Sequence, residues 1–261
     1  MRELTLAAPH IHRLVVPFLD IYTTIFLVET AEGTVVFDTA TYPEDIDRYL
    51  VSALRELGGE KPLWVVISHN HRDHGGGLAR FAELFPDTPI AAGSGACAER
   101  VPGRTVRVLT DGEVLTGPLR AVTIPGHTED CVGLLDTRTG TLLSGDGLQL
   151  YGIYGSGAWG ANVGLIPEHM ALGKKLLTMD ISCILASHNY HPRDWRADGR
   201  EAVADYIEQC AKALRDIRDY AMSHPDLTDE EAAQHYNAAS GLPTVAPRIF
   251  KAARAWKTNG I

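Results

Sequence analysis

The sequence has few cysteines and no long hydrophobic run, and both absences narrow its class. Its 261 residues include 4 cysteines, none of which forms a Cys-x-x-Cys pair. We therefore expect a chain that folds without disulfides in a reducing cytoplasm. No apolar run approaches the roughly 20 residues that a helix needs to span a bilayer, and the first residues lack the apolar core of a secretion signal. The expectation is a cytoplasmic protein with no membrane partner.

Positive charge is also scarce. The chain has 24 Lys and Arg against 33 Asp and Glu, and its formal net charge is -9 at pH 7. Proteins that bind nucleic acids neutralise phosphates with clusters of Lys and Arg, and this sequence has no such cluster, so we expect no nucleic-acid partner. A small uncharged or cationic substrate fits the charge balance better, although a local cationic pocket is compatible with it.

The chain does contain a dense group of side chains that bind metals. In Ser-His-Asn-His-Arg-Asp-His-Gly-Gly-Gly at 68–77 they are His69, His71, Asp73 and His74. The apolar run at 62–67 predicts a buried strand that ends where the group begins, which is where α/β folds place their chemistry. Imidazole and carboxylate ligands suit zinc, iron or manganese. The alternative is a polar loop in which Asp73 caps a helix.

Three later polar residues also follow predicted strands. His127 comes after the run that ends at Ile124, Asp146 after a strand at 141–144, and His188 after a strand at 181–186. Each alone reads as a loop or turn residue, but together with the first group they indicate one site. Asp38, at the end of a strand at 34–37, either orients a metal-bound imidazole or caps the next loop.

The remaining pattern predicts an α/β chain with a helical end. Apolar residues at helical spacing predict core-facing helices at 43–57, 78–85 and 167–178, and strands are expected at 10–16, 22–29, 90–92 and 131–136. From 198 onward a long amphipathic helix is followed by a helix with a capping box at Thr228 and a third helix after Pro247. With 45% hydrophobic residues, one domain with a helical appendage is expected.

The order His-x-His-x-Asp-His, Pro-Gly-His-Thr, Ser-Gly-Asp and a late Ser-His resembles the metallo-β-lactamase superfamily, over roughly residues 10–192. The resemblance implies a four-layer αββα sandwich at 1–197 and a helical C-terminal extension at 198–261. It also implies two divalent metal ions, zinc foremost, with iron or manganese as alternatives. The implied ligands are His69, His71 and His127 for the first ion, Asp73, His74 and His188 for the second, and Asp146 as the bridge.

Family and metal chemistry together imply a hydrolase that cleaves a small ester, thioester or lactone with a metal-bridging hydroxide. It would be similar to the hydroxyacylglutathione hydrolases and lactonases. Asp146 stands where many β-lactamases of this fold have cysteine, which argues against antibiotic hydrolysis. The alternative is an iron-dependent oxidoreductase of the same fold, similar to persulfide dioxygenases or flavodiiron proteins. The lack of a flavin or rubredoxin-like segment favours hydrolysis.

Catalytic roles can be assigned to two further groups. Asp73 is placed to relay a proton to the leaving group, and Tyr190 is the candidate donor to the oxyanion. His191 is a second candidate for the ligand position given to His188. The Gly- and aromatic-rich segment at 151–164 is expected to form a wall or lid of the substrate pocket, and the C-terminal helices either cover the site, form a homodimer contact or simply pack on the sandwich.

Overall fold

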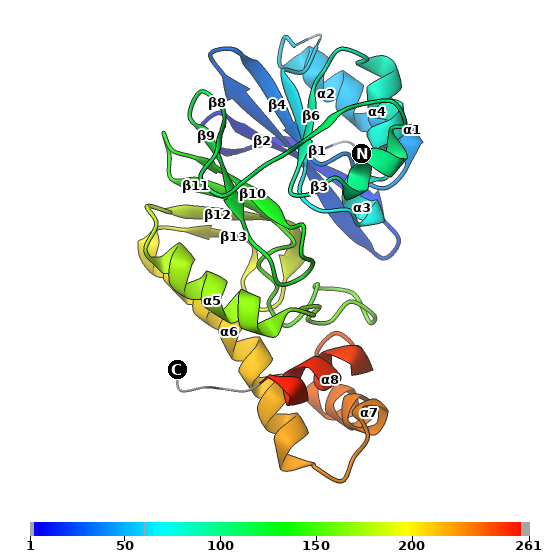
Figure 1. Cartoon of the computed structure of the whole chain (residues 1–261), viewed down its shortest axis with the longest axis vertical. Helices are drawn as coiled ribbons and strands as arrows, with labels where there is room; N and C mark the ends of the chain where they lie inside the picture. The colour runs from blue at the N-terminus through cyan, green and yellow to red at the C-terminus, as the bar shows by residue number, and fades with distance from the viewer. Residues whose placement is uncertain (1–2, 60, 257–261) are drawn as a thin grey trace.

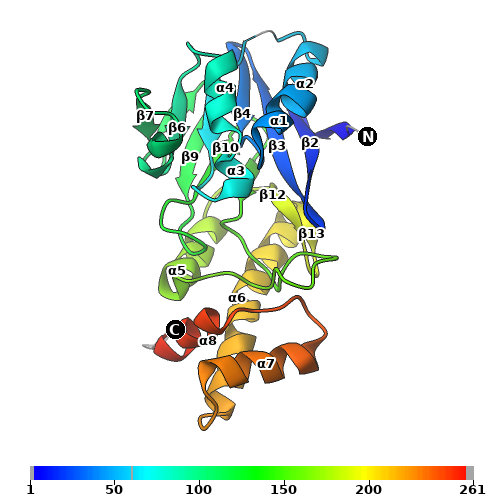
Figure 2. The ribbon, with the colours of Figure 1, turned by 90° about the vertical axis from the view of Figure 1, so that its right-hand side faces the viewer.

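The computed structural model describes residues 3–59 and 61–256, which form two β-sheets packed face to face (Figures 1 and 2). The first sheet has the order β1-β2-β3-β4-β5-β6-β7, antiparallel as far as β4 and parallel from β4 to β7. Its strands are β1 (Glu3–Ala8), β2 (Ile11–Phe18), β3 (Ile21–Thr30), β4 (Gly33–Phe37), β5 (Trp64–Ile67), β6 (Ile90–Ala92) and β7 (Val106–Val108).

The second sheet has the order β13-β12-β11-β10-β9-β8, and only its β11–β12 pair is parallel. Its strands are β8 (Val114–Thr116), β9 (Leu119–Thr123), β10 (Val132–Asp136), β11 (Thr141–Gly145), β12 (Cys183–Tyr190) and β13 (Asp194–Asp198). Strands β12 and β3 lie in contact where the two sheets meet. Parallel strands next to one another end at the same edge of a sheet, so polar residues after them are brought together.

Helices cover the outer face of each sheet. Beside the first sheet lie α1 (Pro43–Asp45), the π-helical turn η1 (Ile46–Leu50), α2 (Val51–Glu56), α3 (Arg72–Gly75), α4 (Leu78–Leu84) and the 3-10 turn η2 (Ala96–Arg100). Beside the second lie α5 (Ile166–Leu177) and α6 (Arg200–Ser223), and the chain ends in α7 (Asp229–Ser240) and α8 (Pro247–Ala255).

The apolar strands are explained by burial on both faces. In β4, Phe37 packs in the core between the sheets, whereas Val36 packs in the core under η1, α2 and α4. A third apolar core lies between the second sheet and helices α5 and α6. Three cores between four layers confirm the predicted αββα sandwich. Within the described residues, no helix is long and apolar enough to cross a membrane.

The C-terminal helices form a small bundle below the sandwich (Figures 1 and 2). Helix α6 belongs to both parts: Tyr206 packs in the core of the second sheet, whereas Leu214 and Ile217 pack with α7 and α8. Helix α7 starts with the predicted capping box, in which the Glu231 N–H donates to Thr228 Oγ1 at 3.2 Å. A division at 197/198 stays a prediction, because α6 is shared.

Candidate metal centre

Three histidines meet at one edge of the sandwich. His69 and His71 follow β5, His71 on extended backbone, and His127 follows β9. Their nitrogen atoms lie within 4.8 Å of one another, and His127 Nε2 is 2.9 Å from His71 Nδ1. His69 and His127 are buried, whereas His71 is exposed. We call these three histidines the first metal group; His71 is its solvent-exposed member.

The turn before His127 requires glycine. Gly126 has φ 151°, and a Cβ there would lie 2.6 Å from the Nδ1 atom of the buried His169 on α5. Any side chain would push α5 and the turn apart. The Pro-Gly-His sequence thus places His127 by close packing of backbone against helix.

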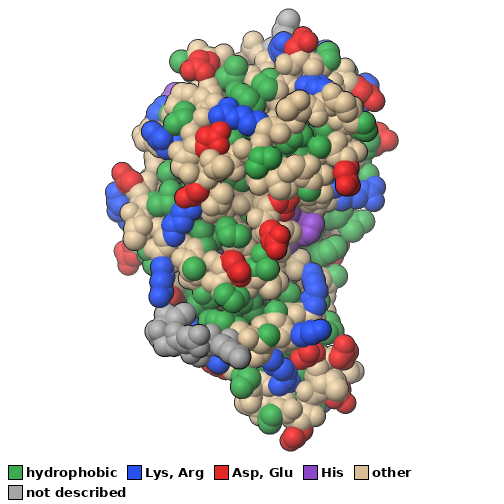
Figure 3. All heavy atoms as spheres, in the orientation of Figure 1, with side chains coloured by type: hydrophobic (Ala, Val, Ile, Leu, Met, Phe, Trp, Pro, Cys, Tyr) green, Lys and Arg blue, Asp and Glu red, His purple; other side chains and the backbone are tan. Residues whose placement is uncertain are grey.

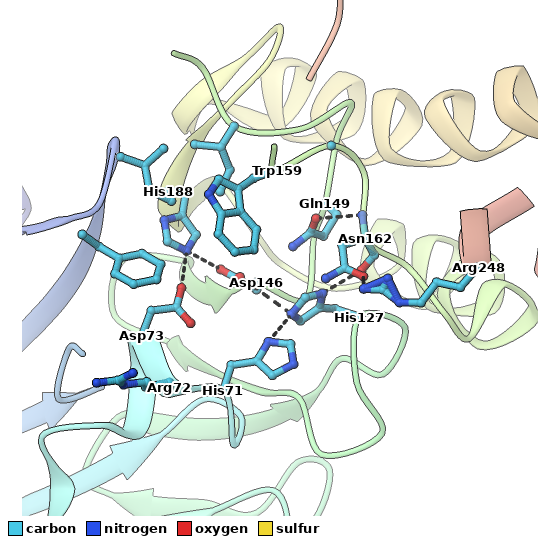
Figure 4. A pocket seen from close by; sticks show the side chains of 14 residues that line it. His71, Arg72, Asp73, His127, Asp146, Gln149, Trp159, Asn162, His188 and Arg248 are labelled. Carbon is cyan, nitrogen blue, oxygen red and sulfur yellow. Dashed lines mark hydrogen bonds and ion pairs between the residues drawn. The ribbon is translucent and has the colours of Figure 1, made fainter. Parts of the chain in front are cut away.

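The second group lies beside the first and contains Asp73, His74, Asp146 and His188. Asp73 and His74 come from α3, Asp146 directly follows β11, and His188 lies near the end of β12. The Nε2 atom of His188 is 3.3 Å from Asp73 Oδ2 and 3.4 Å from Asp146 Oδ1. Figure 4 shows Asp73, Asp146 and His188 of this group beside His71 and His127 of the first.

Asp146 lies between the two groups. Its Oδ1 atom is 3.5 Å from His74 Nε2 in the second group, and its Oδ2 atom is 3.8 Å from His127 Nε2 in the first. One carboxylate oxygen therefore faces each group. All seven residues that the sequence singled out as ligands are brought together; their role as ligands stays a prediction.

Each buried imidazole of the two groups is held through its Nδ1 atom. His69 contacts Ser68 Oγ at 3.1 Å and His74 contacts Asp38 Oδ2 at 2.7 Å. His127 donates to the Asn162 carbonyl at 2.6 Å, and His188 donates to the Tyr22 carbonyl at 2.5 Å. Such partners fix the ring and its tautomer, so that Nε2 is left for a metal.

Buried atoms without partners give a direct test of fit. Within the described residues no hydrogen-bond partner exists for four buried atoms of the centre: His69 Nε2, His74 Nε2, His188 Nε2 and Asp146 Oδ1. Buried polar atoms are rarely left unsatisfied. His74 Nε2 and His188 Nε2 lie 3.5 and 3.4 Å from Asp146 Oδ1 in the second group, whereas His69 belongs to the first. A divalent cation in each group would satisfy these atoms. The His and Asp donor set therefore fits a divalent metal ion.

The electrostatics of the two groups differ. Burial lowers the pKa of His127 to about 4, and burial with repulsion from His74 lowers the pKa of His69 well below its usual value. Both rings are thus neutral near pH 7, as ligands must be. Burial alone would lower the pKa of His188 too, but Asp146 and Asp73 raise it to about 9. A cation in the second group takes the place of such protons.

A cavity of about 340 Å³ opens above the centre. Its floor includes residues of both metal groups, and its apolar wall is made by Phe18, Ile21, Ile153 and Trp159. The rings of Phe18 and Trp159 are 6.3 Å apart and join the β2–β3 hairpin to the 151–164 segment. In the space-filling view, histidine shows between the upper body and the C-terminal helices (Figure 3).

The 151–164 segment forms a wall of this cavity, tied to the C-terminal helices. The Gly160 N–H donates to the Thr244 carbonyl at 2.9 Å, and the Tyr151 hydroxyl donates to Asp216 on α6 at 2.5 Å. Arg248 of α8 reaches over the wall and donates to Asn162 Oδ1 at 2.6 Å (Figure 4). The appendage therefore contributes a cationic side chain to the cavity.

Tyr190 and His191 lie away from the cavity surface. Tyr190 is completely buried, and burial raises the pKa of its hydroxyl well above the usual value. Its hydroxyl accepts a hydrogen bond from Gln149 Nε2 at 3.1 Å, beneath the centre. The His191 ring packs 4.8 Å from the Tyr154 ring and belongs to neither metal group. Direct donation from Tyr190 to a substrate stays a prediction that this burial does not support.

Residues that line the cavity but were not predicted include Gln149 and Arg248, whereas Asn162 lies in the segment expected to form the wall. Gln149 lies only three residues after Asp146, and this proximity is the one feature of the sequence that could have placed it near the site. Asn162 acts through its backbone, and Arg248 lies 60 residues after His188. Their positions depend on tertiary packing.

Residues 20–188 match the sequence model of the metallo-beta-lactamase superfamily. The chain belongs to this superfamily. It is 31% identical over 150 residues to the uncharacterized protein YobT of Bacillus subtilis, a match that covers 49% of this chain and 62% of YobT. It is 26% identical over 225 residues to a hydroxyacylglutathione hydrolase of Pseudomonas putida, covering 75% of this chain and 82% of that enzyme.

Solved structures show the same fold. A metallo-beta-lactamase family protein from Thermus thermophilus superposes with a TM-score of 0.71 at 18% identity, covering 96% of this chain and 92% of that one. The match therefore includes the C-terminal helices. Membership of the superfamily and the His/Asp cluster together support a divalent metal site.

Proposed function

We propose that this protein is a dinuclear metal-dependent hydrolase that cleaves a small ester, thioester or lactone. The observation that carries the proposal is the pair of adjoining donor groups, with orphaned imidazole and carboxylate atoms, at the floor of an apolar cavity. Seven side-chain donors are too many for one tetrahedral ion. The two oxygens of Asp146 face different groups, so this carboxylate would serve an ion in either group.

His69, His71 and His127 would hold one ion, and Asp73, His74 and His188 the other. Two divalent ions held this way supply Lewis acidity and a hydroxide nucleophile at neutral pH. The protein adds orientation and shelter. The apolar wall of Phe18 and Trp159 keeps bulk water from the acyl group, and partly exposed Asp73 is the carboxylate placed to pass a proton to the leaving group.

The cavity favours an acyl compound with an apolar part. A volume of about 340 Å³ suits a small molecule and is too small for a macromolecule. Arg248 adds one positive group at the rim of the cavity, so an anionic group on the substrate is accommodated. The net negative charge of the chain alone favoured an uncharged or cationic substrate. Relatives named hydroxyacylglutathione hydrolase support hydrolysis of a thioester. A homodimer through the C-terminal helices is a further proposal.

The test is turnover with controlled metal content. The protein is loaded separately with zinc, manganese or iron, its metal content is measured, and a panel of thioesters, esters and lactones is assayed with and without oxygen. We expect close to two ions per chain and cleavage by the zinc or manganese form that is indifferent to oxygen. Turnover that required iron and consumed oxygen on a persulfide-type thiol would instead establish the oxidoreductase alternative.

A further inference from the structure

The carboxamide of Gln149 has an orientation that its neighbours determine. The Asn162 backbone N–H can only donate, and it lies 3.1 Å from Gln149 Oε1. The other end of the amide is therefore the nitrogen, which donates to the Tyr190 hydroxyl at 3.1 Å. Oxygen and nitrogen cannot exchange places without setting two donors against each other.

This orientation leaves one N–H for the cavity. An amide nitrogen carries two hydrogens, and within the described residues Tyr190 is the acceptor recorded for Gln149 Nε2. Gln149 is 4% exposed, yet it lines the cavity together with Asp146 and His127. Figure 4 shows its nitrogen turned toward these residues, away from Asn162.

We propose that Gln149 is a catalytic residue that donates this N–H to the carbonyl oxygen of the acyl substrate. The proposal rests on the hydrolase function proposed above. When water adds to the acyl carbon, the π pair of the C=O bond moves to the oxygen, where negative charge develops. The pair then returns, the bond to the leaving group breaks, and the proton lost by water is the one the leaving group gains. Gln149 transfers no proton; it stabilises the charge.

Gln149 is better placed for this task than Tyr190. The Tyr190 oxygen already accepts from Gln149, and the Tyr190 side chain is completely buried. Tyr190 is therefore a positioning residue for Gln149. Because the amide is fixed at both ends before substrate binds, donation costs little reorganisation.

The experiment replaces the amide while keeping its length. Gln149→Met removes the donor, and Gln209→Met, on half-buried Gln209 of α6, is the matched control. With phenyl thioacetate, we expect the kcat of Gln149→Met to fall about 100-fold, the typical effect of one lost oxyanion donor, with little change in KM or metal content. An unchanged kcat, or a loss matched by lost metal, would overturn the proposal.

Binding of methyl benzylphosphonate, a tetrahedral anion mimic, is read by calorimetry without turnover. Its affinity should fall by a similar factor in Gln149→Met and not in Gln209→Met. Gln149→Glu, which keeps an acceptor for Asn162 but has no N–H, should also bind it weakly, and serves if the Met variant does not fold. If the wild type cleaves no acyl substrate, the hydrolase proposal fails, while equal phosphonate binding by wild type and variants would refute the role of Gln149 on its own.

Discussion

The Nδ1 atom of His74 lies 2.7 Å from Oδ2 of Asp38, and both side chains are completely buried. The same carboxylate accepts the backbone N–H of Ser68 at 2.7 Å and its hydroxyl at 2.9 Å. Asp38 thus connects the end of β4 to the first residue of the metal-binding loop. The sequence left its role open between capping and orientation, and the structure places it in contact with an imidazole of the centre.

Replacing Asp38 should weaken the centre without removing a ligand. We expect Asp38→Asn to lower metal affinity about 10- to 100-fold, because the partner that fixes the His74 ring and raises its basicity is lost. Competition with a chromophoric chelator measures this. The control is Asp45→Asn. The Asp45 carboxylate accepts the Tyr42 N–H at a distance of 2.9 Å and belongs to neither metal group, so this substitution should affect stability alone. Equal affinities in both variants would contradict the prediction.

Asp146 is predicted to be the residue on which both metal groups depend. Asp146→Ala should lose at least one metal ion per chain and most turnover, since its two oxygens face different groups. Elemental analysis and circular dichroism together distinguish metal loss from unfolding. Exposed Asp226→Ala is the control. Near-normal activity and metal content in Asp146→Ala would place the bridge elsewhere.

The residues of the centre could be found from the sequence because they are dense or follow strands. The four residues from His69 to His74 lie within six positions of the sequence, which makes them conspicuous. The three later residues, His127, Asp146 and His188, each follow an apolar run. The contact of Asn162 with His127 and the place of Arg248 could not be found, since the first is made by a backbone carbonyl and the second reaches the cavity from α8. No local sequence pattern predicts either contact.

The strands and helices were likewise predicted only in part. Strands β4 and β5 are continuous apolar runs because both faces are buried, and they were found. Strand β13 was missed because its residues are largely polar and partly exposed. The helix expected at 43–57 contains the π-helical turn η1, and spacings of three and four residues cannot distinguish that turn from a regular helix.

His188 and His191 should respond differently to substitution. His188 Nε2 is 3.3 Å from Asp73 in the second group, whereas the His191 ring packs against Tyr154. We expect His188→Ala to lose metal from this group and nearly all turnover, and His191→Ala to keep its metal content. Metal titration of both variants decides the matter. A greater metal loss in His191→Ala would assign the ligand position to His191.

Arg248 is predicted to select for charge on the substrate. Within the described residues its guanidinium contacts the neutral Asn162 Oδ1 and no carboxylate, so it is available to an anion. For a thioester bearing a carboxylate, Arg248→Gln should raise KM about tenfold, because one partly screened hydrogen bond between charged groups is lost. The KM for a neutral thioester should change little. Lys251→Gln, exposed on the same helix, is the control. Equal effects on both substrates would refute charge selection.

Two truncations separate the structural and functional parts of the C-terminal region. Removing residues 198–261 takes away all of α6, including Tyr206 and Ile207, which complete the core beside the second sheet. We expect that protein to be insoluble, because a large apolar face is uncovered. Removing 224–261 keeps α6 and takes away Arg248.

The shorter truncation uncovers Leu214 and Ile217, which pack against Phe250, and it also frees the 151–164 wall from Thr244. We expect a folded protein that keeps its metal content, because every donor of the centre lies before residue 189. Its solubility should be lower and its KM higher, since the wall loses its support and the cavity loses the Arg248 guanidinium. Size-exclusion chromatography, metal analysis and steady-state kinetics measure the three effects. If this truncation stayed soluble, had the same oligomeric state as the full chain and showed unchanged kinetics, α7 and α8 would have no part in either the pocket or a dimer contact.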